Sequence, residues 1–274
     1  MQERTPFSRR HPVWFSVVMM ALFVGLTIVL SLVFSPFSHF ADGSGPYYLI
    51  RIARRLIAAA VFVMIARKIK IALPASRLRF DWVVLLASLC LLTINLSVPT
   101  LFDARSWLYA VQNPLKTLLL LLDCLMIGGL EEIVFRGVIF GALQRAWESK
   151  RRGLLSAVVV SSLLFGLVHI ANLIENPDAL LEVLGQVGYS TLIGLLLALA
   201  ALRTGGITFS IVLHGLFNFV YDYAQMLPFS SSSPWYVETA EAITLAIAYG
   251  CLAVTGICML NRELKAKDGI SVSS

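Results

Sequence analysis

The sequence contains few charged residues for its length. Of its 274 residues, 14% are Asp, Glu, Lys or Arg and 58% are hydrophobic, whereas soluble domains carry about 25% charged and 45–50% apolar residues. A water-soluble globular fold is therefore excluded. A disordered chain is excluded as well, because disorder requires low hydrophobicity and high charge. The net charge of +6 does not indicate nucleic-acid binding, since the Lys and Arg residues lie between long apolar runs.

Cysteines and standard metal-binding motifs are also scarce. The four cysteines have no C-x-x-C spacing and all lie inside apolar segments: Cys90, Cys124, Cys251 and Cys258. We expect them to be small core residues and not disulfides or metal ligands. The sequence has no H-E-x-x-H motif and no internal repeat, and the segments between the apolar runs are short. A separate soluble domain is therefore not expected.

Eight apolar stretches are long enough to cross a bilayer, which takes about 20 residues. They are residues 13–34, 47–66, 82–98, 115–140, 154–170, 179–202, 207–223 and 237–260. The first is about twice as long as the apolar core of a signal peptide, so we interpret it as a retained helix. The predicted fold is all-α: a polytopic helix bundle over residues 13–260 whose main partner is the lipid bilayer.

The basic residues between these stretches predict an orientation. Segments on one side of the predicted bilayer carry 16 Lys and Arg residues and those on the other side carry two. Positive charge concentrates on the cytoplasmic side, so residues 1–12 and 261–274 are both expected to be cytoplasmic. The bias and the compact loops are typical of a multi-pass protein of the bacterial inner (plasma) membrane. The sequence does not indicate an oligomeric state.

Ionisable residues inside a bilayer span are energetically expensive and mark functional sites. The span 115–140 contains two adjacent carboxylates, Glu131 and Glu132, followed by Arg136. Glu132 and Arg136 are spaced i, i+4 with the acid first, which favours an ion pair. Glu131 then has no partner on its own helix, which makes it a candidate general base. A buried ion network that only fixes helix packing is the alternative.

Two further polar pairs lie in neighbouring spans. Phe165 and His169 are spaced i, i+4 in span 154–170, and His214 and Asn218 have the same spacing in span 207–223. Each pair taken alone is as consistent with helix packing as with function. Together, a glutamate, two histidines and an amide on three helices can activate a water molecule and stabilise an oxyanion.

These motifs resemble those of a known family. Glu131-Glu132-x-x-x-Arg136, Phe165-x-x-x-His169 and His214-x-x-x-Asn218 are similar, in type and order, to the three motifs of the CAAX-protease and bacteriocin-processing family of intramembrane proteases, which includes the type II CAAX prenyl endopeptidases. The resemblance covers residues 115–223, the expected catalytic core.

The resemblance implies peptide-bond hydrolysis within the membrane. It implies that Glu131 is the general base, that His169 polarises the water, and that His214 and Asn218 stabilise the oxyanion. Glu132 and Arg136, with Phe165, would support the site. We expect no metal or other cofactor, although zinc held by Glu131, His169 and His214 is an alternative.

Other interpretations stay open at this stage. An ion- or proton-coupled transporter also places Glu, His and Arg within its spans, and a non-catalytic peptide-binding or immunity protein would keep the same bundle. The substrate is expected to be a membrane-associated peptide or a lipidated protein. Arg51, Arg54 and Arg55 share one helix face in span 47–66, and they either extend to the lipid headgroups or line the interior.

The depths of the candidate residues do not agree if all spans are straight and end at the same level. From the helical rise, His214 lies roughly 10 Å from the cytoplasmic end of its span, and Glu131 and His169 lie roughly 20–25 Å from theirs.

Overall fold

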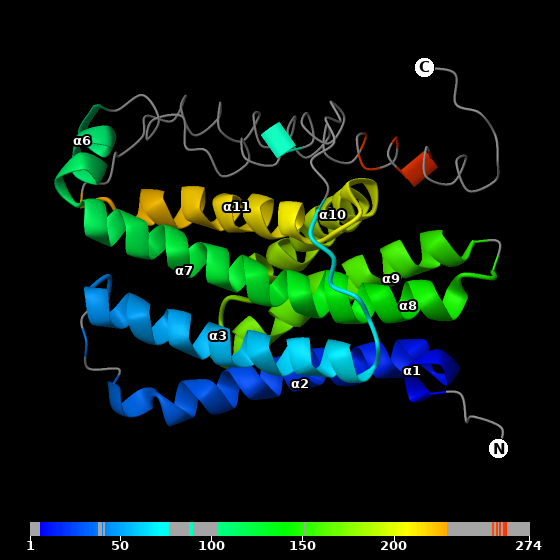
Figure 1. The fold of residues 1–274 in the computed structure, drawn as a ribbon. Helices are drawn as coiled ribbons and strands as arrows, with labels where there is room; N and C mark the ends of the chain where they lie inside the picture. The colour runs from blue at the N-terminus through cyan, green and yellow to red at the C-terminus, as the bar shows by residue number, and fades with distance from the viewer. Residues whose placement is uncertain are drawn as a thin grey trace.

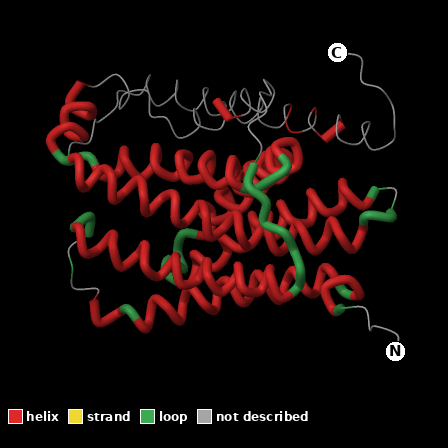
Figure 2. Tube along the Cα trace, in the orientation of Figure 1, coloured by secondary structure: helices red, strands yellow, loops and turns green. Residues whose placement is uncertain are grey.

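The computed structural model describes residues 6–37, 40, 42–76, 88–89, 104–150 and 152–228, together with positions 254, 256, 258, 260 and 261. Within these residues the chain is helical and has no strand (Figure 2), which confirms the all-α prediction. The predicted spans 82–98 and 237–260 lie almost entirely outside the described residues. The number of eight spans and the cytoplasmic termini therefore stay predictions.

The described helices recover five of the six remaining predicted spans within a few residues, and the sixth, 115–140, continues further as a helix. They are α1 (Phe7–Arg10), α2 (Pro12–Val33), η1 (Ser35–Phe37), α3 (Gly45–Lys68), α6 (Ala104–Gln112), α7 (Pro114–Glu132), η2 (Ile133–Phe140), α8 (Gly141–Trp147), α9 (Gly153–Leu167), η3 (Val168–Ile174), α10 (Leu180–Thr204) and α11 (Thr208–Met226). Most of them lie roughly parallel or antiparallel to one another (Figure 1).

Three helical segments among the described residues are long and apolar enough to cross a membrane by length and composition: Pro12–Val33, Gly153–Ile174 and Leu180–Thr204. Helices α3 and α7 are of similar length but carry several charged residues along their lengths. Because these charges lie on helices packed into the same bundle, they need partners inside it. The apolar helices support an integral membrane protein.

Helix α7 does not end where the predicted span 115–140 ends. It continues without a break through the π-helical segment η2 and through α8 to Trp147. The π-helical geometry begins at Ile133, directly after Glu132. Segments of π-helix are rare and are found frequently at functional sites, so this change of helical geometry is a first structural indication of where a site lies.

Two glycines bring α7 and α11 into close contact. A Cβ atom added to Gly128 of α7 would lie 2.8 Å from the backbone nitrogen of Gly215 in α11. Only glycine at both positions allows this separation of the backbones. Gly128 lies one helical turn before the Glu131–Glu132 pair, and Gly215 directly follows His214, so the contact sets the glutamates opposite the histidine.

The turn between α10 and α11 explains the apparent difference in depth. Gly205 ends α10 in the left-handed conformation with φ of 69°, which glycine adopts without strain. The turn packs against the segment that follows α3, and Ile207 N donates a hydrogen bond to Pro74 O at 3.1 Å. Figure 1 shows α10 and α11 meeting well short of the end of the α8–α9 pair. Helix α11 therefore begins inside the bundle, and His214 reaches the level of Glu131.

The close contact between α7 and α11 gives a first prediction. Gly128→Ala should lower the free energy of unfolding by about 1–3 kcal/mol, because the added methyl group meets backbone and not a flexible side chain. Gly129→Ala is the matched control. Its added Cβ would lie 3.7 Å from a methyl group of Ile211, an ordinary contact, and alanine favours helix by up to about 1 kcal/mol. Thermal unfolding of both variants in detergent checks this, and equal losses of Tm in the two would contradict it.

Candidate active site

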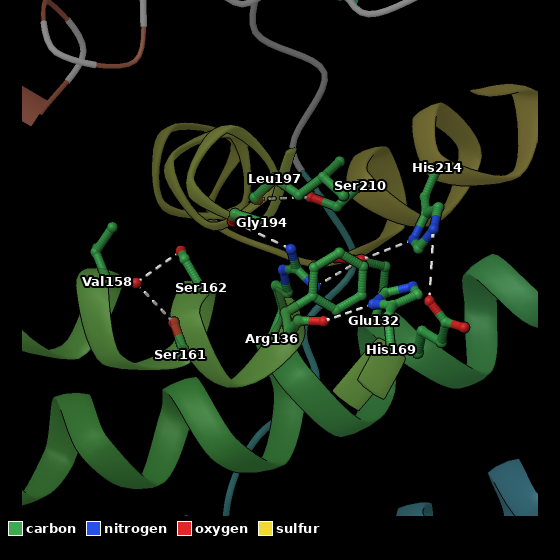
Figure 3. A network of polar contacts seen from close by, with 12 residues as sticks. Glu132, Arg136, Val158, Ser161, Ser162, His169, Gly194, Leu197, Ser210 and His214 are labelled. Carbon is green, nitrogen blue, oxygen red and sulfur yellow. Dashed lines mark hydrogen bonds and ion pairs between the residues drawn. The ribbon is translucent and has the colours of Figure 1, made fainter. Parts of the chain in front are cut away.

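The centre of the site is the carboxylate of Glu132. Its side chain is fully buried and lies between two positively polarised groups from different parts of the bundle. Oε1 accepts a hydrogen bond from Nδ1 of His214 at 3.0 Å, and Nη1 of Arg136 lies 3.1 Å from the same oxygen. Figure 3 shows this network. The predicted Glu132–Arg136 ion pair is confirmed, and the pairing of Glu132 with His214 adds to it.

Arg136 extends the network to two more helices. Its Nη2 donates to the carbonyl oxygen of Gly194 in α10 at 3.1 Å. Its guanidinium carbon lies 4.2 Å from the ring centroid of Phe165 in α9, a cation–π contact. A buried guanidinium without partners is strongly unfavourable, so these contacts fix α9, α10 and the η2 segment relative to one another.

The ring of His214 points its second nitrogen at Glu131. Because Nδ1 donates to the Glu132 carboxylate, Nε2 is the nitrogen left to face the site. It lies 3.6 Å from Oε2 of Glu131, which is longer than a hydrogen bond. Glu131 has no partner on its own helix. It therefore lies beside the imidazole of His214, whose orientation is set by Glu132.

His169 is oriented by the backbone of its own helix end. Its Nδ1 lies 3.0 Å from Phe165 O and 3.3 Å from Gly166 O, where α9 changes into the 3-10 segment η3. Carbonyl oxygens only accept hydrogen bonds, so Nδ1 carries the hydrogen and Nε2 of the neutral ring presents a lone pair. The Phe165 ring lies edge-on between the two imidazoles, at centroid distances of 5.5 Å from His169 and 5.6 Å from His214.

Glu131 and His169 line the same cavity, which has a volume of about 520 Å³. From these two residues the cavity extends toward the ends of the helices near the α2–α3 connection, where Thr27, Ser31 and Tyr47 line it. This is the end of the bundle away from the α8–α9 turn (Figure 1).

The bundle thus brings together six of the seven residues that the sequence singles out: Glu131, Glu132, Arg136, Phe165, His169 and His214. Asn218 lies one turn further along α11, is half-buried, and does not line the cavity. Its side chain forms no hydrogen bond with a described residue. No group of three or more His, Cys, Asp or Glu residues in the described ranges is placed to hold a metal ion.

Sequence analysis missed one buried acid. Asp123 in α7 is fully buried and pairs with two arginines of α3: Arg51 Nε lies 2.9 Å from its Oδ2, and Arg55 Nη1 contacts its Oδ1. The signal was present, because Asp123 is an ionisable residue inside a predicted span. Asp123 lies eight residues before Glu131 and outside every motif, so the motifs do not predict that it forms ion pairs.

Comparison with known families agrees with this geometry. Residues 113–220 match the family model described as Type II CAAX prenyl endopeptidase Rce1-like. Residues 113–220 are an Rce1-like domain. The Rce1-like match runs from α7 into α11 and contains all seven residues that the sequence motifs single out. It confirms the family expected from those motifs and supports a protease. No curated protein and no solved structure matched the chain.

The charge network of the Rce1-like domain gives a second prediction. Arg136→Met should lower the free energy of unfolding by about 3–5 kcal/mol, because it leaves the Glu132 carboxylate buried without its counter-charge. Adding Glu132→Gln should recover much of this loss, since the pair then carries no charge.

The measurement is a double-mutant cycle from thermal unfolding of the two single variants and the double variant. The double variant should be more stable than Arg136→Met alone. Strictly additive losses would show that the two side chains do not stabilise each other and would contradict the network.

Proposed function

We propose that this protein is an intramembrane endopeptidase that hydrolyses a peptide bond of a membrane-associated peptide or protein. One observation carries the proposal: Glu131 and His169 line a single cavity, and Glu131 lies 3.6 Å from the imidazole of His214. A carboxylate and an imidazole that line one cavity, with a second oriented imidazole beside the carboxylate, suit the activation of water. The Rce1-like family of residues 113–220 supports the same reaction.

In the proposed mechanism, Glu131 is the general base. It takes one proton from a water molecule as the water oxygen attacks the carbonyl carbon of the substrate. His169 orients this water, because the lone pair on its Nε2 can accept the second water hydrogen. Glu131 then delivers its proton to the nitrogen that leaves as the C–N bond breaks. Positioned proton transfer of this kind accelerates reactions by about 10²–10⁴-fold.

His214 and Asn218 are proposed to stabilise the negative oxygen of the tetrahedral intermediate. The hydrogen bond between Nδ1 of His214 and Glu132, at 3.0 Å, orients the ring, so that Nε2 would donate to the developing charge when both ring nitrogens carry hydrogen. Asn218 has an amide without a partner among the described residues, one helical turn away. In the proposal it would complete the oxyanion site once a substrate is bound.

A proton-coupled transporter is the second candidate, and one observation favours it. Arg136 also lines a second cavity of about 560 Å³, which lies between the α10–α11 turn and α8. The Glu132–Arg136–His214 network therefore has a cavity on either side, as an alternating-access protein requires. A buried arginine between the two cavities opposes proton passage, because its positive charge repels protons. The protease is therefore the stronger candidate.

The third prediction tests the base. Glu131→Gln should reduce the cleavage rate of a membrane-tethered peptide by at least 10²-fold, because the amide cannot accept the proton of water. Glu182→Gln, in the exposed first turn of α10, is the matched control and should keep full activity. Mass spectrometry of membranes with each variant measures the cleaved product.

The outcome separates the alternatives. A single defined product that is lost in Glu131→Gln supports the protease. Altered ion flux without a product in either form would favour the transporter. Retained peptide binding without a product in either form would favour a non-catalytic binding or immunity protein.

The fourth prediction concerns metal dependence. If Glu131 acts on water directly, dialysis of the purified protein against a strong chelator should leave kcat within about twofold of its starting value. A zinc ion acting as the Lewis acid would be needed in every turnover. A loss of activity that added zinc restores would contradict the metal-free mechanism and favour the alternative in which Glu131, His169 and His214 hold zinc.

A further inference from the structure

The segment η3 forms one side of the cavity that contains Glu131 and His169. It continues α9 away from the α8–α9 turn, from Val168 to Ile174, and has 3-10 geometry. In a 3-10 helix, side chains three residues apart lie directly above one another. The segment therefore presents its side chains in straight rows along the cavity.

Two of the three rows of η3 line the cavity. They are the apolar row of Val168, Ala171 and Ile174, and the row of His169, Asn172 and Glu175, here called the polar row. The third row, with Ile170 and Leu173, does not line the cavity. The 3-10 geometry thus aligns an imidazole, an amide and a carboxylate in a polar row that begins beside Glu131.

The α3 side of the same cavity is charged, and its charges have partners. Arg51, Arg54 and Arg55 line the cavity, which decides between lipid headgroups and the interior in favour of the interior. Asp123 pairs with Arg51 at 2.9 Å and with Arg55, and Glu175 of the polar row attracts Arg54 electrostatically. The amide of the polar row takes no part in these ion pairs.

The side-chain amide of Asn172 is held at one end. Its Nδ2 donates a hydrogen bond to Oε1 of Gln186 in α10 at 2.8 Å. This bond sets the orientation of the amide and leaves Oδ1 at the other end as an acceptor. Oδ1 accepts no hydrogen bond from any residue that the structure describes, and the side chain lines the cavity. Asn172 therefore offers an oriented acceptor to a molecule in the cavity.

A peptide that enters this cavity needs acceptors of this kind. Its backbone N–H groups lose their hydrogen bonds to water when the peptide leaves the aqueous phase, and an unsatisfied N–H in an apolar environment is strongly unfavourable. The apolar row of η3 has no side-chain group that accepts a hydrogen bond. An N–H that faces η3 next to this row can therefore be satisfied by the amide of Asn172.

The spacing of the polar row matches that of an extended peptide. Three residues of a 3-10 helix rise about 6 Å, which separates His169 from Asn172 along the row. Two residues of an extended peptide span about 6.6–7.2 Å, and its groups that face the same side repeat every two residues. A peptide whose reacting bond lies beside His169 would thus bring a backbone N–H to Asn172 about two residues away.

We propose that Asn172 binds the backbone of the substrate, with Oδ1 accepting the N–H of a residue two positions from the hydrolysed bond. Gln186 is the positioning residue that holds the amide. Because the contact is made with the backbone, it fixes the register of the peptide without selecting a side chain. The distance from the bond rests on the proposed function, whereas the hydrogen bond itself does not depend on catalysis.

The test uses N-acylated decapeptides of alanine and leucine in neutral nanodiscs. A phosphinic group replaces the central peptide bond, which fixes the register at Glu131 and prevents cleavage. In a series of these peptides, one further peptide bond at a time is replaced by an ester, which removes the N–H and keeps the extended shape. Binding is measured for the wild-type protein, Asn172→Leu, Asn172→Asp and Asn176→Leu. Asn176 is exposed, does not line the cavity, and is the matched control.

We expect the wild-type protein and Asn176→Leu to bind the peptide with an ester two positions from the phosphinic group about 3- to 10-fold more weakly than the parent peptide, the range typical of one hydrogen bond. Asn172→Leu should remove this difference and leave the effects of esters at other positions unchanged. Asn172→Asp keeps an acceptor oxygen and should keep the difference. A residue that only fixed η3 to α10 would weaken the binding of all the peptides alike.

Two results would overturn the proposal: no weakening by the ester two positions from the phosphinic group in the wild-type protein, or a weakening that persists in Asn172→Leu. Failure of the wild-type protein to bind the parent peptide would overturn it as well. Cleavage of a membrane-tethered peptide without the Asn172-dependent ester effect would retain the protease and refute the backbone contact. The ester effect without cleavage of any membrane-tethered peptide would retain the contact and refute the protease.

Discussion

The site depends on one buried carboxylate. One oxygen of Glu132 accepts a hydrogen bond from His214 and forms an ion pair with Arg136. These contacts join α7, η2 and α11. Through Arg136 the network reaches Phe165 of α9 and Gly194 of α10. A charge buried this completely is tolerated only when its partners are held in place. The helices that carry the motifs are therefore fixed around Glu132, and Glu131 beside it stays available for the role of base that we propose.

This division of labour between adjacent glutamates follows from helix geometry. Consecutive side chains point about 100° apart, so Glu132 can face the interior of the bundle while Glu131 faces the cavity. The close approach of Gly128 and Gly215 sets both opposite His214. Because Nδ1 of each imidazole is engaged, by Glu132 in His214 and by backbone carbonyls in His169, the Nε2 atoms are the ones available to a substrate or water.

The sequence predicts the helices and most of the site because both leave local signals. Apolar runs of bilayer length locate five spans within a few residues, and the i, i+4 spacing of Glu132 and Arg136 predicts their ion pair. Contacts between distant segments leave no such signal. The recessed α10–α11 turn depends on packing against Pro74, and the pairing of Arg51 and Arg55 with Asp123 joins residues about 70 positions apart. The π-helical geometry after Glu132 likewise has no pattern in the sequence that predicts it.

The central claim is that Glu131 and the two imidazoles act on one reacting carbonyl. It is tested most directly by an experimental structure of the protein with a phosphinic peptide, whose tetrahedral phosphorus replaces the hydrolysed bond. The account predicts one phosphinate oxygen within about 3 Å of Glu131 and the other within hydrogen-bonding distance of His214. A phosphinic group bound away from Glu131, or a peptide seated outside the cavity, would contradict it.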